Sequence, residues 1–293
     1  MCGRYASAAR SDDLAQMTGA RDDTGALPAS SNVAPTTTVT VLLHDSGLRD
    51  AGAPRARTRV LRAMRWGLVP HWAPSPAVGA RMINARVETV ADKSAFREPL
   101  RRRRCLVPAT GWYGWTDAGV AGTPGPFRGG SSRQPWLTHR EDGQPLLMAG
   151  LWSTWRVPHE DRALPHNGNL PHNCNSPHNC NLPHNCNLLH SAAIVTRPAP
   201  PTLAWLHDRA PLLVPDAAVD DWLDQQCIEP APLLDLLMHA EDPPLHTHPV
   251  DPAVGDVRRQ EPELVRPIPL VPAEPAPVAQ LTPLVQPAQP SLF

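Results

Sequence analysis

The second residue of the sequence is a cysteine, and its position gives it unusual chemistry. Methionine aminopeptidase removes an initiator methionine readily before a small residue, so we expect Cys2 to carry a free α-amine beside its thiol. An α-amine has a pKa of about 7.7–8.0 and is partly neutral at physiological pH. A neutral amine condenses with an aldehyde to an imine, and the adjacent thiol then closes a thiazolidine ring, a step that proximity favours. Taken alone, a cysteine here is most often only a small residue near a terminus.

A series of short polar and aromatic blocks follows Cys2 along most of the chain. The blocks are NVAPTTTV (32–39), MRWGLVPHWA (64–73), INARVET (83–89), RRCLVPATGWYGW (103–115), AGLW (149–152), IVTRPAP (194–200), LHDRAP (206–211) and VGDVRRQEPELVRPI (254–268). In this order and spacing they resemble the SRAP family, the SOS-response-associated abasic-site processing proteins. The resemblance covers residues 1–268 apart from one insert.

The resemblance implies a covalent thiazolidine link between Cys2 and abasic sites in single-stranded DNA, where the ring-opened deoxyribose presents an aldehyde. It also implies that this link protects damaged replication forks. Asn84 matches the asparagine of the family's NAR motif, which lies beside the cysteine, and its amide both donates and accepts hydrogen bonds. His207 matches the histidine of the HxRMP motif, and an imidazole that titrates near neutrality can move protons during imine formation.

Other residues are expected to contact DNA. Arg4 and Arg86 match family arginines near the DNA backbone, where a guanidinium suits phosphate oxygens, and Arg209 is the arginine of the HxRMP motif. Trp66 stands in an active-site block and can stack on an unpaired base. The arginine run at 101–104 is either a solvated face or a phosphate-binding patch.

One position departs from the family pattern. The motif G-(F/W)-(Y/F)-E-W reads GWYGW here, so Gly114 replaces the glutamate that serves the family as an acid or base. General acid–base catalysis contributes about 10²–10⁴-fold, so the crosslinking rate should fall by that order. Glu88 is a candidate substitute, although a structural ion pair with an arginine is an equal alternative. Asp117 should face away from position 114.

Two other functions compete with the crosslinker. A chain without the glutamate can be a weakened paralogue that binds single-stranded DNA or junctions with little covalent product. An N-terminal-nucleophile hydrolase using Cys2 ranks last, because no oxyanion machinery is recognisable. Family members are also described as lyase-like and peptidase-like. A shifted band on a denaturing gel separates the first two readings, and turnover of amides or esters would favour the third.

Bulk composition limits the class of protein. The 293 residues carry a formal net charge of −1, so DNA binding must come from a local patch. The start lacks the apolar segment of a secretory signal, and no run approaches the roughly 18 apolar residues of a membrane span. We therefore expect a cytoplasmic, nucleoid-associated monomer. Without a CxxC pair among Cys2, Cys105 and Cys227, neither a disulfide framework, a cofactor nor a metal site is expected.

The periodicity of the chain predicts an α+β fold, a single SRAP-like domain with a mainly antiparallel, barrel-like β core and flanking helices. Short strands are expected at 39–43, 60–66, 81–86, 105–108, 111–115, 146–152 and 191–196. Ser11 should cap a helix that carries Leu14 and Met17 on one face. Asp216 should cap another helix, carrying Val219, Trp222 and Leu223, and apolar residues in 233–238 form a further helical stripe.

Two segments are not expected to join the core. Residues 165–188 repeat a hexad, PHNCNL in its commonest form, which we place in an insert at about 157–190. Its histidines and cysteines are possible metal ligands, but repeat expansion is the simpler explanation. Residues 269–293 form a Pro-rich tail after the 1–268 domain. Its last residues, QPSLF, resemble the bacterial sliding-clamp-binding pentapeptide, with Gln289, Leu292 and Phe293 as the binding side chains.

Overall fold

Five strands form a closed ring in the computed structural model, which describes residues 2–45, 58–117, 133–157 and 188–269. Around the ring the order is β11–β10–β7–β4–β5. The strands are β4 (Thr38–His44), β5 (Arg59–Trp66), β7 (Arg104–Ala109), β10 (Leu146–Arg156) and β11 (Leu188–Pro198). Neighbours pair antiparallel except β11 and β5, whose parallel pairing at Ser191 and Ala192 closes the barrel.

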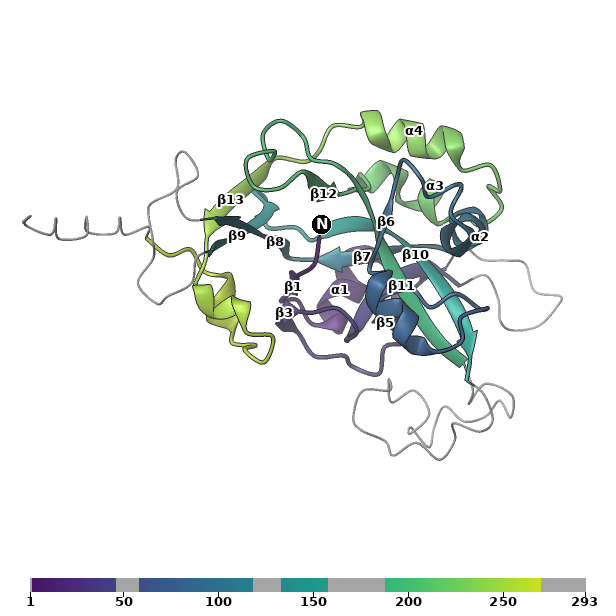
Figure 1. The fold of residues 1–293 in the computed structure, drawn as a ribbon, viewed down its shortest axis with the longest axis horizontal. Coiled ribbons are helices and arrows are strands. Elements are labelled where there is room, and N and C mark those ends of the chain that lie inside the picture. Colours follow the sequence, from purple (N-terminus) through teal and green to yellow (C-terminus); the bar gives the residue numbers. More distant parts are fainter. Residues whose placement is uncertain (1, 46–57, 118–132, 158–187, 270–293) are drawn as a thin grey trace, which may run out of the picture.

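A second sheet of five antiparallel strands stands beside the barrel, with the order β13–β9–β8–β1–β3. Its strands are β1 (Tyr5–Ser7), β3 (Ser30–Val33), β8 (Gly111–Asp117), β9 (Arg133–Arg140) and β13 (Leu245–Pro249). β7 runs into β8 through Thr110, so one continuous segment joins the two sheets. Figure 1 shows the purple start of the chain centrally between them. Three short strands extend the barrel sheet: β2 (Arg21–Asp22), β6 (Asn84–Arg86) and β12 (Arg209–Pro211).

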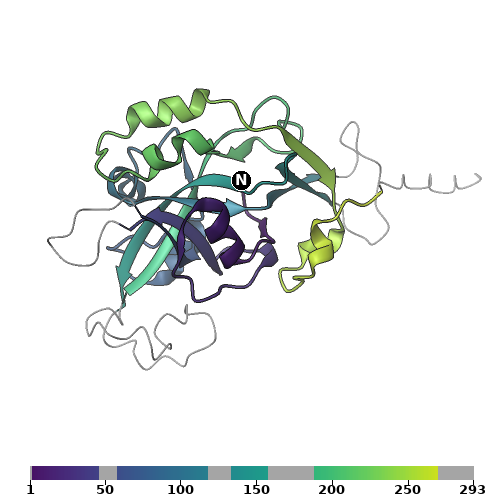
Figure 2. The same cartoon turned by 180° about the vertical axis from the view of Figure 1, so that it is seen from behind.

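Helices cover the outside of the barrel. The α-helices are α1 (Ser11–Thr18), α2 (Ser94–Arg102), α3 (Val219–Leu223) and α4 (Ala231–His239). The 3-10 turns are η1 (Pro76–Arg81), η4 (Asp216–Ala218), η5 (Pro252–Gly255) and η6 (Pro262–Val265). In Figure 2, α1 lies on the near side of the barrel, with α3 and α4 along one end. Among the described residues, every helix is too short or too polar to cross a membrane.

The barrel wall is buried on both faces, because successive side chains of a strand point to opposite sides. In β4, Val41 and Leu42 are both fully buried but belong to two different apolar clusters. The Leu42 cluster includes helix residues such as Trp222 of α3. The Val41 cluster includes Cys2 and Tyr5. The first residues of the chain are therefore packed into the core and held in a fixed place.

The structure confirms the expected α+β fold with a mainly antiparallel barrel, and corrects several local predictions. Of the strand expected at 81–86, only Asn84–Arg86 form a strand, β6, because only these three residues pair with β11, and Arg81 is the last residue of the 3-10 turn η1. Ser11 is the first residue inside α1 and not its cap. Asp216 begins η4 and makes no capping hydrogen bond. Met17 is exposed, while Leu14 alone of that predicted pair is buried.

The end of the predicted domain lies against the second sheet. The backbone N–H of Ile268 donates to the carbonyl oxygen of Pro249, at 3.0 Å, directly after β13. Leu264 of η6 is buried with Tyr113 of β8. The 1–268 boundary remains a prediction, because residues 158–187, which contain all of the hexad repeat except Leu188, and residues 270–293 lie outside the described residues.

Candidate active site

A pocket of about 280 Å³ opens where the start of the chain, β8 and the segment between β11 and β12 meet. Cys2 and Arg4 line it from the chain start, Gly114 from β8, and His207 and Arg209 from the third segment. Small-molecule pockets begin at about 300 Å³, so this volume suits a group of the size of one sugar unit. The pocket brings together four of the eight residues predicted to act in catalysis or DNA binding.

Cys2 sits at the inner wall of this pocket, with 2% of its surface exposed. Burial raises the pKa of its thiol to about 12, against a smaller lowering by the charged N-terminus. Asn84 fixes the residue, because its Nδ2 donates to the Cys2 carbonyl oxygen at 2.8 Å. The Asn84 Oδ1 is also buried and has no hydrogen-bond partner in the part of the chain that the structure describes. This oxygen can accept a hydrogen bond from an amine or a sugar hydroxyl.

His207 lies on the opposite wall, carried by the turn that precedes β12. The backbone N–H of Arg209 donates to its Nδ1 at 3.0 Å, and the Asp208 carboxylate contacts the same nitrogen. Burial lowers the pKa of the imidazole, and Arg209 acts in the same direction, against Asp208. The ring is therefore neutral at pH 7 and can accept a proton.

Gly114 has no space for a side chain in this conformation. A Cβ built on it would lie 2.5 Å from the Cγ of Leu206 and 2.8 Å from both of its methyl carbons. Leu206 is 6% exposed and lines the pocket. The backbone of Gly114 is ordinary strand, and the three atoms nearest to such a Cβ all belong to Leu206, so this leucine is the first obstacle to a larger residue. Leu206 thus fills the volume that the family's glutamate would need.

Glu88 does not line the pocket but pairs with Arg209. The two guanidinium nitrogens Nη1 and Nη2 donate to the two carboxylate oxygens at 2.5 and 3.0 Å. This pairing is the main cause that lowers the pKa of Glu88. Nη2 of Arg209 also donates to the Thr196 carbonyl oxygen at 2.7 Å. Glu88 is therefore placed to orient Arg209. This ion pair is one of the two roles that the sequence suggests for Glu88, the other being a substitute acid or base.

The other two predicted arginines have different surroundings. Arg4 lines the pocket, and its Nη1 donates to Asn32 Oδ1 at 2.5 Å and to the Val254 carbonyl oxygen at 3.0 Å. Because these partners are neutral oxygens, they orient the guanidinium without cancelling its charge. Arg86 is exposed at the end of β6 and is not part of the pocket wall.

The structure contradicts the expected stacking role of Trp66 and removes one residue from the arginine run considered at 101–104. Trp66 is 1% exposed, its Nε1 donates to the Ile83 carbonyl oxygen at 3.0 Å, and its ring packs edge-on against Tyr5. Trp66 packs against the first residues of the chain in the apolar core and cannot stack on a base. Arg104, the last residue of the 101–104 run, is fully buried and cannot take part in a phosphate patch.

The sequence interpretation missed two residues beside the pocket. Trp205 is 42% exposed and is held by an edge-on contact with Trp136, with ring centroids 5.0 Å apart. Because Trp205 directly precedes the LHDRAP block at 206–211, its position in the sequence could have marked it as a site residue. Arg133 at the start of β9 lines the pocket and donates to Asp117 at 2.9 Å. No local pattern marks it, since only the β8–β9 pairing brings it there.

Known proteins of similar sequence match most of this chain. Residues 1–257 match the family model for SOS response associated peptidase (SRAP). Abasic site processing protein YedK of Escherichia coli is 30% identical over 279 residues, covering 92% of this chain and all of that protein. Abasic site processing protein YoqW of Bacillus subtilis is 25% identical over 267 residues, covering 90% of this chain and 99% of that protein. Abasic site processing protein HMCES of Xenopus tropicalis is 28% identical, over 90% of this chain and 77% of that protein.

Solved structures share the fold at low sequence identity. A protein of Bacteroides thetaiotaomicron superposes with a TM-score of 0.63 at 17% identity, covering 91% of this chain and all of that one. A protein of Bordetella bronchiseptica gives a TM-score of 0.58 at 20% identity, over 85% of this chain and all of that chain. The family match extends over most of the sequence and includes every residue of the pocket. This chain therefore belongs to the SOS response associated peptidase (SRAP) family.

Proposed function

We propose that this protein processes abasic sites by forming a covalent thiazolidine crosslink to single-stranded DNA through Cys2, after removal of Met1, and so protects damaged replication forks. The observation that carries the proposal is the shared pocket of Cys2 and His207, with Asn84 holding the Cys2 backbone. An aminothiol and a neutral proton acceptor face one cavity of sugar size. The names of the relatives, abasic site processing proteins, support the same substrate.

The reaction balances with one molecule of water released. The Cys2 amine attacks the aldehyde carbon to give a carbinolamine, which loses water to form an imine. The S–H bond then adds across the C=N bond, so that a C–S bond forms and the thiol proton passes to nitrogen. Because burial raises the pKa of the Cys2 thiol, the thiol stays protonated and the amine attacks first. Cys2 holds the amine and the thiol on adjacent carbons, Cα and Cβ, so the thiol closes a five-membered ring, a step that proximity favours.

His207 serves this sequence as the proton carrier. Its lowered pKa keeps the ring neutral. It takes a proton from the attacking amine or from the thiol at Nδ1, which then exchanges its hydrogen bond with the Arg209 backbone N–H for one to Asp208. The Asp208 carboxylate beside the ring then stabilises the protonated form. Glu88 acts as a positioning residue, since it fixes the guanidinium of Arg209 at the rim.

The cationic groups of the pocket suit the phosphates that flank an abasic sugar. Arg4 and Arg209 line the cavity with their guanidinium groups oriented by carbonyl and carboxylate oxygens. Arginine forks match phosphate oxygens well. The exposed ring of Trp205 offers a surface on which a neighbouring unpaired base can stack, worth about 1–3 kcal/mol. Arg86 adds an exposed charge beyond the pocket.

A denaturing gel tests the proposal. Purified protein incubated with single-stranded DNA that carries one abasic site should give a band that survives denaturation, and Cys2→Ala should reduce it to background. The matched control is Cys227→Ala, since Cys227 is half-buried and does not line the pocket. It should crosslink like the native protein. Native protein that binds the DNA but gives no resistant band would overturn the proposal.

The crosslinking rate should depend on pH through His207. Since burial lowers its pKa below the usual 6.5, the ring gains a proton only in acid, and the rate should fall as pH drops through that lowered value. His207→Gln should reduce the rate by about 10²–10⁴-fold and remove this acid limb. The fall in rate caused by protonation of the α-amine, at about pH 7.7–8.0, should remain. Rates measured from pH 5 to 9 for both proteins check this, and an unchanged acid limb in His207→Gln would exclude the role.

We also propose that the chain binds the bacterial sliding clamp through Gln289, Leu292 and Phe293, which lie outside the described residues. Leucine and phenylalanine side chains would fill an apolar pocket while the glutamine bonds at its rim. A labelled peptide of residues 284–293 should bind purified clamp in a polarisation assay. Leu292→Ala with Phe293→Ala should abolish binding, whereas a change of Gln286 to Ala should not. A native peptide without affinity for the clamp would end this proposal.

A further inference from the structure

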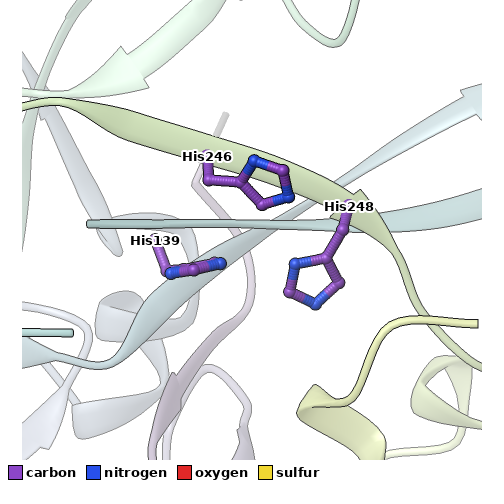
Figure 3. A group of neighbouring side chains, drawn as sticks. All are labelled: His139, His246 and His248. Carbon is purple, nitrogen blue, oxygen red and sulfur yellow. The ribbon is translucent and has the colours of Figure 1, made fainter. Parts of the chain in front are cut away.

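Three histidines gather on neighbouring strands of the second sheet, away from the pocket (Figure 3). His139 lies on β9, and His246 and His248 lie on β13. His246 is directly paired with His139 across the ladder, and His248 is two residues further on the same face. One ring nitrogen of each residue lies within 4.8 Å of the other two. Figure 3 shows these nitrogens turned toward the space between the rings.

The cluster faces away from the Cys2 pocket. His139 is paired with Gly111 of β8, so both project to the same side of the sheet. Gly114, which lines the pocket, is three residues further along β8 and therefore projects to the other side. Gly111 has no side chain to cover His139, and a Cβ there would meet the Thr138 carbonyl oxygen at 2.6 Å. The histidines thus form a separate site, independent of the proposed function.

Two of the rings already have the hydrogen bonds typical of metal ligands. Nδ1 of His139 lies 2.8 Å from the Arg140 carbonyl oxygen, and Nε2 of His248 lies 3.0 Å from the Val265 carbonyl oxygen. A carbonyl oxygen only accepts, so each of these nitrogens donates its proton and the opposite nitrogen keeps a free lone pair. Metal-bound histidines in proteins almost always donate their second N–H to such an acceptor.

The ligand type and protonation state select the metal class. A metal binds neutral imidazole, the form in which the two hydrogen-bonded rings each keep a free lone pair. Imidazole nitrogens suit zinc, copper and nickel. Nitrogens around a tetrahedral zinc ion at about 2.0–2.1 Å lie about 3.3 Å apart, so the rings must close somewhat from their present spacing. His246 is exposed and free to turn inward.

We propose that His139, His246 and His248 bind a divalent transition-metal ion of the zinc class, in a three-histidine site with an open position for water or an external ligand. The Val265 carbonyl oxygen belongs to η6, so an ion at His248 would also secure η6 against β13. Binding to the folded sheet raises the melting temperature, since an unfolded chain does not hold the three rings together.

Zinc titration of the full-length protein tests the site. His246→Gln removes one exposed ligand without disturbing the core, and His239→Gln, an exposed histidine at the end of α4, is the matched control. Loss of an outer-shell hydrogen-bond partner alone weakens metal binding by about 10–100-fold. Loss of a direct ligand in His246→Gln should therefore weaken zinc binding by at least this factor. This variant should also lose the zinc-dependent rise in melting temperature, which His239→Gln should retain. Crosslinking to abasic DNA should be unchanged in both.

The hexad repeat and Cys2 also offer histidine or cysteine ligands for zinc. A second measurement is therefore needed to identify which residues bind the ion. With Co²⁺ as the probe, the native spectrum minus the His246→Gln spectrum should contain visible ligand-field bands without thiolate charge-transfer absorption. Equal zinc affinity in the native and His246→Gln proteins would overturn the proposal. So would a cobalt difference spectrum dominated by thiolate charge transfer, or a native protein that binds neither ion.

Discussion

A Gly114→Glu, Leu206→Ala double variant is expected to crosslink to abasic DNA about 10²–10⁴-fold faster than the native protein, the usual contribution of a positioned acid or base. A carboxylate at position 114 would project into the cavity that already contains Cys2 and His207. The leucine must be removed with it, because a Cβ at 114 lies 2.5 Å from the Cγ of Leu206. Single-turnover rates on one abasic oligonucleotide measure the gain.

Three controls separate the carboxyl group from the change in packing. Gly114→Glu alone should gain little, since the leucine displaces the new side chain or the strand shifts. Leu206→Ala alone should lose about 2–5 kcal/mol of stability, as a buried leucine does, and gain no rate. A Gly114→Gln, Leu206→Ala variant has the same shape without a titratable group. A double glutamate variant no faster than this glutamine variant would contradict the assignment.

Arg104→Met is expected to destabilise the fold by at least about 4 kcal/mol, an exceptional loss for one substitution. The fully buried guanidinium donates to five backbone carbonyl oxygens, those of Leu100, Arg101, Trp222, Asp224 and Cys227. It thereby connects the end of α2 to the chain around and after α3. Methionine would leave these acceptors without donors, and each buried unsatisfied group costs about 1–3 kcal/mol.

Urea unfolding measures this effect through a shift of the midpoint at unchanged slope. The matched control is Arg102→Met, two residues earlier, whose side chain is 59% exposed and pairs with Glu98 one helical turn away. It should change stability by no more than about 0.5 kcal/mol. If the two variants unfolded at the same urea concentration, the carbonyl contacts of Arg104 would not be stabilising.

The barrel strands were predictable from the sequence, because both faces of the wall are buried and the strands are apolar runs. β4, β7 and β11 each read as such runs between turn residues. β9 was not predicted, since its polar sequence becomes a strand only through pairing with β8 and β13. α2 was missed for a similar reason: it contains Pro99 and three arginines, and only its inner face, with Leu100, contacts the core.

The site residues also divide into those that sequence motifs mark and those whose surroundings depend on the folded structure. Cys2, Asn84 and His207 were marked by their motifs, and the pocket and one hydrogen bond connect them. The side-chain environment was not available from any motif. Trp66 was assigned to DNA by its block, but its indole is enclosed by the barrel. The three-histidine cluster was overlooked because its members are distant in sequence, although His246 and His248 in alternate positions of one strand were a usable signal.

The most direct test of the account is the mass of the N-terminal peptide after reaction with abasic single-stranded DNA. Nuclease and protease digestion should release a peptide that begins at Cys2, lacks Met1, and carries the sugar residue with the loss of one water. The unreacted protein should likewise begin at Cys2. A peptide that retains Met1, or an adduct on any other residue, would contradict the central claim.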